Sequence, residues 1–328
     1  MSDVATLAGV SHQTVSRVLA EHPNVRARTR ARVLAAIDEL GYRPNIAARA
    51  LATGRSRTLG VVSMNSTLYG PASTLYSIEE AAKHAGYFVT VASVRSLDRI
   101  SLREATGRLL GQAVDGLVII APLASAADAL RDLPKDTPIV AVEGDTAAHD
   151  AVVRVDQVTG ATIATQHLLA LGHKTVWHVA GPTDWLDAQG RITGWRAALE
   201  QAGAEVPPLL NGDWSAQSGY QAGQVLARMP EVTAVFAGND QMALGLLRAL
   251  GERERRVPAD VSIVGFDDIP EAAYYTPPLT TVRQDFGEVG RRSLHMLIEQ
   301  ITSGMTGVQH ALVGTELIIR QSTATSRG

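Results

Sequence analysis

Residues 3–19, which read DVATLAGVSHQTVSRVL, decide the fold of the N-terminal end. Apolar side chains recur at helical spacing on both sides of Gly9, at Val4, Leu7, Ala8, Val15, Val18 and Leu19. Gly9 can take the left-handed conformation that ends a helix. The hydroxyl of Ser11 can cap the next helix by accepting a hydrogen bond from a backbone N–H. The stretch therefore predicts two short helices joined by a tight turn.

The second of these helices carries a polar face. Its side chains are long enough, or placed well enough, to reach the edges of bases: His12, Gln13, Ser16 and Arg17. A short helix with such donors on one face is what recognition in the major groove of DNA requires. The competing interpretation is an ordinary helical hairpin whose polar residues face water.

The distribution of charge favours nucleic acid over the simple hairpin. Residues 1–57 contain nine Arg, no Lys and four acidic residues, a net charge of +5. The whole chain has a net charge of −3, so the remaining residues carry −8. A basic head on an acidic body places the attraction for phosphate at one end of the molecule.

The segment that follows completes the head and leads into a hinge. A third helix is expected over residues 29–40, with apolar side chains at Val33, Leu34, Ile37 and Leu40 that close a three-helix core. Residues 45–54 read NIAARALATG and predict a short Ala-rich helix that is not stable alone in water. Its small side chains suit close approach to the minor groove, with Leu51 as a wedge between base steps.

From residue 59 onward, short β-branched segments alternate with amphipathic helices. Strands are expected at 59–62, 88–91, 117–120 and 139–142, and again at 175–179, 234–237 and 262–266. The helix at 286–303 and the apolar segments 312–313 and 317–319 are expected to return the chain between the two sets. The pattern predicts an α/β fold with two doubly wound Rossmann-like lobes and a ligand cleft at the strand ends.

The resulting plan has three parts. A head, residues 1–44, precedes a hinge helix and linker, residues 45–57, and a core, residues 58–328. We expect the first lobe of the core at about 58–155 plus 286–313, and the second at about 156–285 plus 314–328. Since so small a head reads only half a site, a two-fold homodimer on a pseudo-palindrome is expected. Residues 322–328 read STATSRG and contain no heptad helix, which favours a dimer over a tetramer.

The loops at the predicted strand ends carry the candidate effector site. They bring together carboxamides, carboxylates, a guanidinium and aromatic rings, at Arg191, Trp214, Asn239, Gln241, Asp267, Asp268 and Phe286. Such groups suit a sugar, because the planar carboxamide, carboxylate and guanidinium groups bind its hydroxyls and the aromatic rings cover the C–H face of the sugar ring. Each residue also has an ordinary interpretation as a helix cap, a turn, a core ring or a surface ion pair. Their common position at strand ends favours the site.

Composition and motifs exclude several other classes. The 328 residues are 45% hydrophobic, enough for two or three domains, and include no cysteine for disulfides or thiolate chemistry. No signal segment or membrane-spanning run is present, so a cytoplasmic protein is expected. We find no Gly-x-Gly-x-x-Gly, no catalytic triad and no metal spacing among the nine His, which predicts a non-enzyme without cofactor or metal. A periplasmic sugar-binding protein would share the body but would need a signal peptide and no head.

From Asp3 to about Ser322 the chain resembles transcriptional regulators of the lactose-repressor family. The resemblance rests on the motif at residues 3–19 and on the hinge motif Gly41-Tyr42-Arg43-Pro44-Asn45, with Ala48, Arg49 and Leu51 after it. It implies that His12, Gln13 and Arg17 contact bases, and that Ser16 and Asn45 fix the DNA backbone. Ser11, Thr14 and Ala48 complete the implied DNA-binding set. Arg26 stands where the family commonly has a capping Ser, and it offers a further phosphate contact.

The effector-site motifs resemble those of the sugar-responsive members. The resemblance implies that Arg191, Asn239 and Asp267 bind hydroxyls, that Trp214 and Phe286 pack on the ring with Gln241 in support, and that Leu68 and Pro71 line the pocket from the first lobe. Glu143 replaces a family Asp and narrows the pocket. The purine-responsive branch shares the Arg and Asp, but Trp214, Asn239 and Phe286 favour a sugar. The resemblance thus implies a repressor released from its operator by a sugar. A co-repressor-dependent regulator and a sugar-binding protein without regulatory role are the alternatives.

Overall fold

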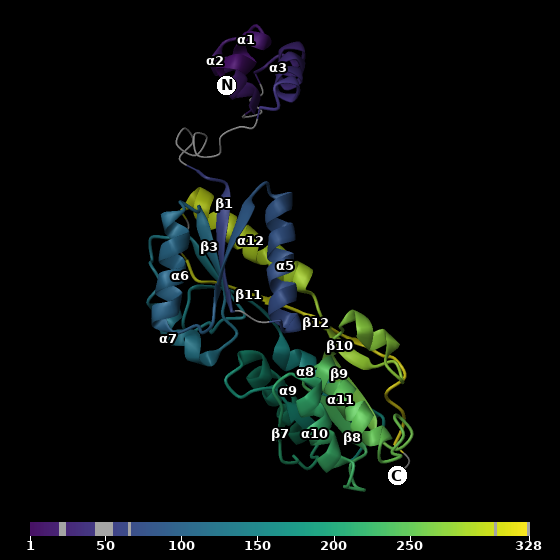
Figure 1. Ribbon diagram of the computed structural model, residues 1–328. Coiled ribbons are helices and arrows are strands. Elements are labelled where there is room, and N and C mark those ends of the chain that lie inside the picture. Colours follow the sequence, from purple (N-terminus) through teal and green to yellow (C-terminus); the bar gives the residue numbers. More distant parts are fainter. Residues whose placement is uncertain (20–23, 43–54, 65–66, 305–306, 327–328) are drawn as a thin grey trace. The chain divides into compact units, whose positions relative to one another are not determined.

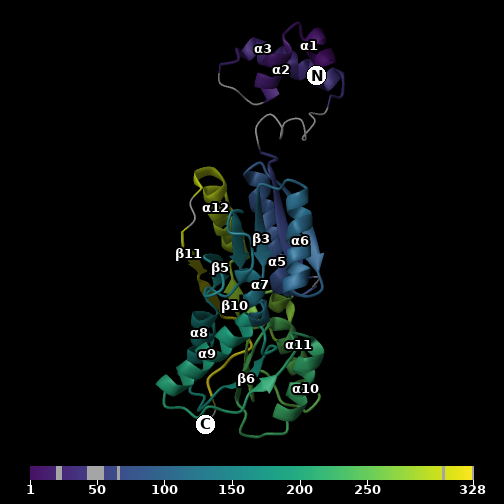
Figure 2. The same ribbon diagram turned by 90° about the vertical axis from the view of Figure 1, so that its left-hand side faces the viewer.

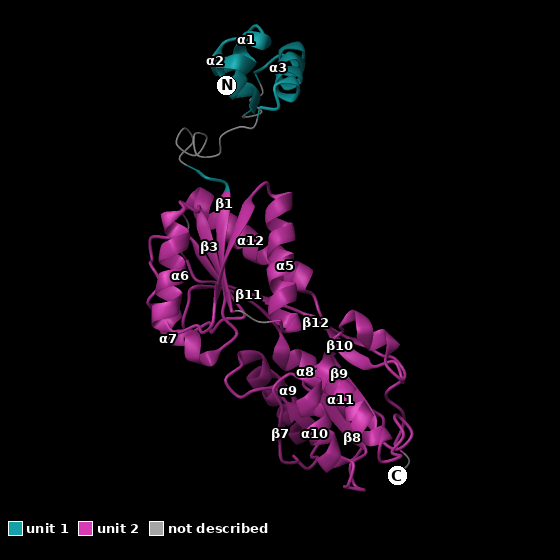
Figure 3. Ribbon diagram, viewed as in Figure 1, with its two compact units in different colours: residues 1–57 teal, residues 58–328 magenta. Residues whose placement is uncertain are grey.

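The computed structural model describes residues 1–19, 24–42, 55–64, 67–304 and 307–326. It divides into two compact units, residues 1–57 and residues 58–328, coloured separately in Figure 3 and described here one at a time. The expected hinge helix, with Asn45, Ala48 and Leu51, lies outside the described residues.

The first unit is built from three helices. These are α1 (Ser2–Leu7), α2 (His12–Leu19) and α3 (Ala27–Glu39). Gly9 has a φ of +59°, the left-handed conformation expected at the end of the first helix. The Ser11 Oγ accepts a hydrogen bond from the Thr14 backbone N–H at 3.2 Å, so Ser11 caps α2. The predicted pair of helices around a tight turn is confirmed.

The core of this unit is made of smaller side chains than the sequence pattern predicted. Its fully or nearly fully buried residues are Val4, Ala5, Ala8, Val15, Val18, Val33 and Ala36. Leu7, Leu34 and Leu40, which we expected in the core, are 47%, 47% and 45% exposed. Small residues on the facing sides of three short helices let the backbones approach closely, which leaves the longer Leu side chains outside.

The first lobe of the second unit is a parallel six-stranded sheet in the order β11-β5-β4-β3-β1-β2. Its strands are β1 (Thr58–Met64), β2 (Phe88–Val94), β3 (Gly116–Ile120), β4 (Ile139–Val142), β5 (Ala151–Val155) and β11 (Gln309–Val313). Helices α5 (Tyr69–His84) and α12 (Phe286–Ser303) pack on one face. The opposite face is covered by α6 (Arg99–Gly111), the short η1 (Ala124–Ala126) and α7 (Ala127–Arg131). Figure 2 shows α12 and α6 on opposite sides of this sheet.

The second lobe repeats the three-layer plan with the strand order β12-β10-β9-β8-β6-β7. The strands are β6 (Trp177–Ala180), β7 (Leu210–Asn211), β8 (Ala234–Ala237), β9 (Ser262–Asp267), β10 (Thr280–Gln284) and β12 (Thr315–Ile318), the last antiparallel to β10. Helices α8 (Gln157–Ala170) and α9 (Leu186–Gln201) cover one face. Helices α10 (Ala216–Leu226) and α11 (Asp240–Gly251) and the short η2 (Pro270–Tyr274) lie on the other. The prediction of two doubly wound lobes is confirmed (Figure 1).

Three strands in the interior of the chain escaped the sequence pattern. β7 contains two residues, β5 is interrupted by Arg154, and β10 buries Thr280 and Thr281 in place of apolar side chains. Threonine favours strands, but its hydroxyl needs a partner before it can enter a core, so two adjacent threonines do not read as part of a buried apolar run. Here the Thr281 hydroxyl donates to Asp240 at 2.6 Å, which makes the burial tolerable.

The chain passes between the two sheets three times, at Asp156, Asp285 and Gly314. The first two crossings end in helix caps. The Asp156 carboxylate accepts from the Thr159 backbone N–H at 2.9 Å, and the Asp285 carboxylate from the Glu288 N–H at 2.8 Å. Each of these two crossings therefore runs directly into an ordered helix. Among the described residues, none of the helices combines the length and the apolar character needed to traverse a lipid bilayer.

Candidate functional site

The α2 helix presents the polar face that the sequence predicted. Ser11, His12, Gln13, Ser16 and Arg17 are all exposed, while Thr14 is half-buried and lies 3.0 Å from the Ser11 hydroxyl. Val15 and Val18 hold the opposite face of the helix in the core. Arg26 is exposed at the N-cap position of α3 and makes no side-chain capping bond there. These donors are therefore positioned for a partner outside the chain.

A closed ring of hydrogen bonds lies at the strand ends of the second lobe. Arg191 Nε donates to Gln157 Oε1 at 2.9 Å, and Gln157 Nε2 donates to Gln284 Oε1 at 2.9 Å. Gln284 Nε2 donates to Asp267 Oδ1 at 2.7 Å, and the Arg191 guanidinium returns to the same oxygen at 3.5 Å. All four side chains are buried. Because every amide in the ring has a donor or acceptor role fixed by its neighbour, the ring holds the charged pair in one arrangement.

Aromatic rings surround this charged pair. The Arg191 guanidinium lies 3.9 Å from the ring centre of Phe266 and 5.2 Å from that of Trp214. The Trp214 Nε1 is buried without a hydrogen-bond partner among the described residues. A buried N–H in that condition costs free energy until an acceptor reaches it. A ligand oxygen would meet that need.

The environment of Asp267 disfavours the ionised form of its carboxyl group, and its backbone is strained. Burial raises the pKa of Asp267 to about 6, because the loss of hydration outweighs the attraction of Arg191. Asp267 and Asp268 have positive φ values of 109° and 54°, a backbone conformation that L residues rarely adopt. The Asp268 carboxylate ties this turn down through ion pairs with Arg283 at 2.7 Å and Arg320 at 2.6 Å.

Asn239 has the structural role that its sequence position also allowed. Its Oδ1 caps α11 by accepting from the Met242 N–H at 2.9 Å, and its Nδ2 donates to the Trp214 carbonyl at 3.0 Å. The carboxamide carries a second N–H. Asn239 therefore both fixes the Trp214 loop and faces the site.

The side chains converge on a small cavity between the lobes. Its volume is about 30 Å³, and its lining consists of Leu68, Tyr69, Gly70 and Pro71 from the first lobe and Trp185, Asp187, Arg191, Trp214, Asn239, Asp267 and Gln284 from the second. Six of the nine predicted effector residues line it. A sugar needs far more room, since small-molecule sites enclose about 300–1,000 Å³. In this conformation the walls fill the space that a ligand would occupy.

The other three predicted residues lie outside that lining. Gln241 is half-buried on α11. Glu143 is buried after β4, where its carboxylate accepts from the Val155 N–H at 3.1 Å. Burial and the nearby Asp187 carboxylate raise the pKa of Glu143 well above its usual range. Glu143 does not line the cavity itself, but it lies near Asp187, which does.

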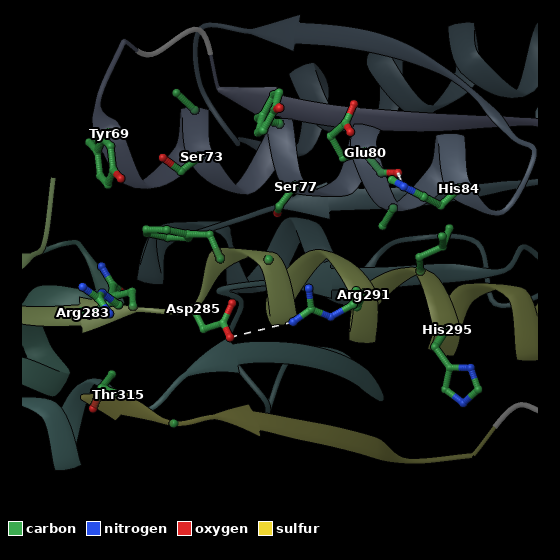
Figure 4. Close-up of a pocket in the computed structure, with 18 of the residues that line it drawn as sticks. Tyr69, Ser73, Ser77, Glu80, His84, Arg283, Asp285, Arg291, His295 and Thr315 are labelled. Carbon is green, nitrogen blue, oxygen red and sulfur yellow. Dashed lines mark hydrogen bonds and ion pairs between the residues drawn. The ribbon is translucent and has the colours of Figure 1, made fainter. Parts of the chain in front are cut away.

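Phe286 opens α12 and packs edge-on against Tyr69, with ring centres 5.9 Å apart. It lines a larger groove of about 1560 Å³ along α5 and α12. Figure 4 shows this groove with Ser73, Ser77 and Glu80 on α5, Arg291 on α12 and Asp285 at the N-cap of α12. Tyr69 lines both spaces. Phe286 therefore contacts a residue that lines the small cavity without lining the cavity itself.

Several cavity residues were missed at the sequence level. Trp185 and Asp187 follow β6, so the rule that ligands bind at strand ends could have found them. Gln284, which lines the cavity, ends the unpredicted strand β10, and its hydrogen-bond partner Gln157 follows the unpredicted strand β5. They became visible as partners of Arg191 and Asp267 only in three dimensions.

Comparison with known proteins agrees with this arrangement. Residues 1–45 match the family described as "Bacterial regulatory proteins, lacI family", and residues 165–323 match a "Periplasmic binding protein-like domain". The chain is 36% identical to the lactose operon repressor of Escherichia coli K12, over 98% of this chain and 89% of that protein. It is 33% identical to the transcriptional repressor PurR of Haemophilus influenzae, over 98% of each.

A crystal structure of the lac repressor dimer bound to operator and the anti-inducer ONPF is similar as well, with a TM-score of 0.84, 34% identity and 98% coverage of each chain. The expectation of a regulator rather than an enzyme is confirmed by these relatives, which are repressors. With a family match at the head and this identity over nearly its whole length, the chain belongs to the lacI family of bacterial regulatory proteins.

Proposed function

We propose that the chain is a cytoplasmic transcriptional repressor that binds a pseudo-palindromic operator as a homodimer and leaves it when a saccharide binds between the lobes. The head supplies the DNA contacts from Ser11, His12, Gln13, Thr14, Ser16, Arg17 and Arg26, with Asn45, Ala48 and Leu51 in the hinge. The proposed boundaries are residues 1–44 for the head, 45–57 for the hinge and 58–328 for the core.

The observation that carries the effector class is the buried ring of Arg191, Gln157, Gln284 and Asp267 beneath Trp214. Guanidinium, carboxamide and carboxylate groups in fixed planes match adjacent hydroxyls, which both donate and accept. The indole supplies an apolar face for the C–H groups of a sugar ring. The lactose operon repressor among the relatives supports this class, and PurR makes a purine the alternative outcome.

The coupling follows from the position of the cavity. A ligand bound between two lobes favours the lobe arrangement for which it has the higher affinity. A change in the lobe arrangement moves Thr58, where the core begins directly after the hinge, and so changes the separation of the two hinges in the dimer. Since the hinge helix is too short to be stable alone, separating the two hinges of a dimer is enough to weaken operator binding.

The test begins with an operator selected from random DNA by the purified protein. Operator retention is then measured with a panel of mono- and disaccharides and with purine bases. Arg191→Ala should bind operator as the unchanged protein does but should not release it with sugar, because it loses charge-assisted bonds to hydroxyls.

Arg196→Ala, an exposed residue on the same helix, is the matched control and should respond normally. Release by purines alone would overturn the sugar class. Tighter operator binding in the presence of sugar would reverse the sign and make the protein co-repressor-dependent.

A further inference from the structure

Two short segments join the lobes beside the cavity. We call residues 122–125 of the first lobe and residues 184–186 of the second the interlobe contact. The Asp184 carboxylate accepts from the Ser125 hydroxyl at 2.6 Å and from the Ser125 backbone N–H at 3.1 Å. The Ala124 N–H donates to the Asp184 carbonyl at 2.8 Å, and the Leu186 N–H donates to the Pro122 carbonyl at 2.9 Å. The two segments thus form a short antiparallel bridge between Leu123 and Trp185.

The same second-lobe segment forms part of the cavity wall. Trp185 and Asp187 both line the cavity, and the Trp185 ring meets the Trp214 ring edge-on, with centres 5.8 Å apart. Trp185 is only 9% exposed. A ligand that touches Trp185 therefore touches the segment that ties the lobes together.

The other walls are anchored more firmly. Arg191 and Asp267 belong to the buried hydrogen-bonded ring, and the Trp214 loop is fixed by Asn239. Gly181 beneath Trp214 has no room even for a methyl group, since a Cβ there would lie 2.1 Å from the indole. The side-chain bonds between Ser125 and Asp184, in contrast, are exposed and can be exchanged for bonds to water. The wall that contains Trp185 is thus held to the first lobe in part by exposed side-chain bonds, whereas the side-chain bonds of the other walls are buried.

Charge acts in the same direction. Asp187, two residues beyond Trp185, is half-buried and lies near the buried first-lobe carboxylate of Glu143. Arg191 on α9 and Arg154 on β5 face this pair and offset part of the repulsion, while Asp267 adds to the negative charge. The pKa values of both carboxyls are raised in the closed arrangement, so ionising the two together there costs free energy that separating them would recover.

We propose that residues 184–187 couple the cavity to the lobe arrangement: an effector entering the cavity displaces Trp185 and opens the interlobe contact, which therefore opposes effector binding. The inference rests on the proposed function for its ligand, a saccharide. It assigns to Trp185 and Asp187 a place in the effector site and to Asp184 and Ser125 the role of holding that site closed.

The first measurement needs no ligand. Acrylamide quenching of tryptophan fluorescence is compared between the unchanged protein and Asp184→Ala. Both proteins are also measured with the additional substitution Trp185→Phe, and the difference between the proteins with and without Trp185 gives the signal of Trp185. Quenching of Trp185 should increase in Asp184→Ala. The matched control is Asp98→Ala, which removes an exposed aspartate bonded to Ser96 and Ser101 within the first lobe alone. It should leave Trp185 quenching unchanged. Unchanged quenching in Asp184→Ala would overturn the proposal.

The second measurement uses glucose, galactose, lactose and cellobiose as probes in titration calorimetry. A sugar that binds the unchanged protein should bind Asp184→Ala about fivefold more tightly, the equivalent of ~1 kcal/mol, which is the net value of an ordinary hydrogen bond. Ser125→Ala should give a similar gain, and the double variant should gain little more than either, because both remove the same contact.

Weaker sugar binding in Asp184→Ala would refute the proposed direction of coupling. If no probe sugar bound any variant, the saccharide function would fail instead, and the quenching result would still decide the role of the interlobe contact.

Discussion

Asp267→Asn should stabilise the protein while removing effector binding. The substitution keeps the shape of the side chain and replaces a buried carboxylate by a neutral group. Burial raises the pKa of Asp267 from 3.8 to about 6 even with Arg191 beside it. At about 1.36 kcal/mol per pKa unit, ionising this group in the folded protein costs roughly 3 kcal/mol above pH 6. The amide does not incur that cost.

The sign of the pH dependence follows from the raised pKa. Well below pH 3.8 the carboxyl is protonated in both the folded and the unfolded chain, so it makes no difference to stability. Between its unfolded value of 3.8 and its folded value of about 6, the unfolded chain ionises first and the protein loses stability. The advantage of Asp267→Asn should therefore grow from pH 4 to pH 6 and stay constant above it.

The assay is urea unfolding of both proteins at pH 4, 5, 6 and 7.5. Asp268→Asn is the neighbouring control and should be destabilising, because it weakens two short ion pairs of a largely buried carboxylate. If Asp267→Asn were less stable than the unchanged protein at pH 7.5, the Arg191 pair would outweigh burial, and the reasoning would be wrong.

Three further predictions concern the site and the head. Effector affinity measured by calorimetry should fall as the pH drops below about 6, because hydroxyls donate to the ionised Asp267, and an affinity that is the same at pH 5 and pH 7.5 would contradict this. Gly181→Ala should displace the Trp214 indole, cost about 1–3 kcal/mol in urea unfolding and abolish effector binding, and an unchanged near-ultraviolet dichroism spectrum would contradict this. Gln13→Ala should cost roughly 1–3 kcal/mol on the selected operator and little on random DNA in a binding titration, and equal losses on both would reduce Gln13 to a phosphate contact.

The features that could be predicted from the sequence are those with a local cause. The turn at Gly9 and the cap at Ser11 depend on neighbouring residues, and the structure has both. The strands of the two lobes were visible wherever continuous apolar runs are buried on both faces, as in β3 and β8. The exposure of Leu34 was not visible, because spacing identifies a helical face without telling which neighbour fills it.

The site shows the same division. Arg191, Asn239 and Asp267 follow or flank strand ends and could be named one by one. The ring that joins Arg191 and Asp267 to Gln157 and Gln284, however, depends on contacts over 17 to 127 residues of sequence. Phe286 was predicted against the ligand, and that role stays a prediction; in the structure its ring packs against Tyr69. Trp185 was overlooked because a lone tryptophan before a helix carries no pattern of its own. Contacts between residues so far apart in the sequence are set by the tertiary structure, which no local sequence pattern encodes.

The three crossings at Asp156, Asp285 and Gly314 determine how the core can be cut and recombined. Each sheet is assembled from two separate stretches, because β11 returns to the first sheet and β12 to the second. A single proteolytic cut in the second lobe, between β6 and β10, therefore leaves two fragments that each hold strands of both sheets, and the fragments should remain associated. For the same reason, a chimera that takes the second lobe from a relative needs three junctions, and a gene truncated at any one crossing encodes no complete pair of lobes.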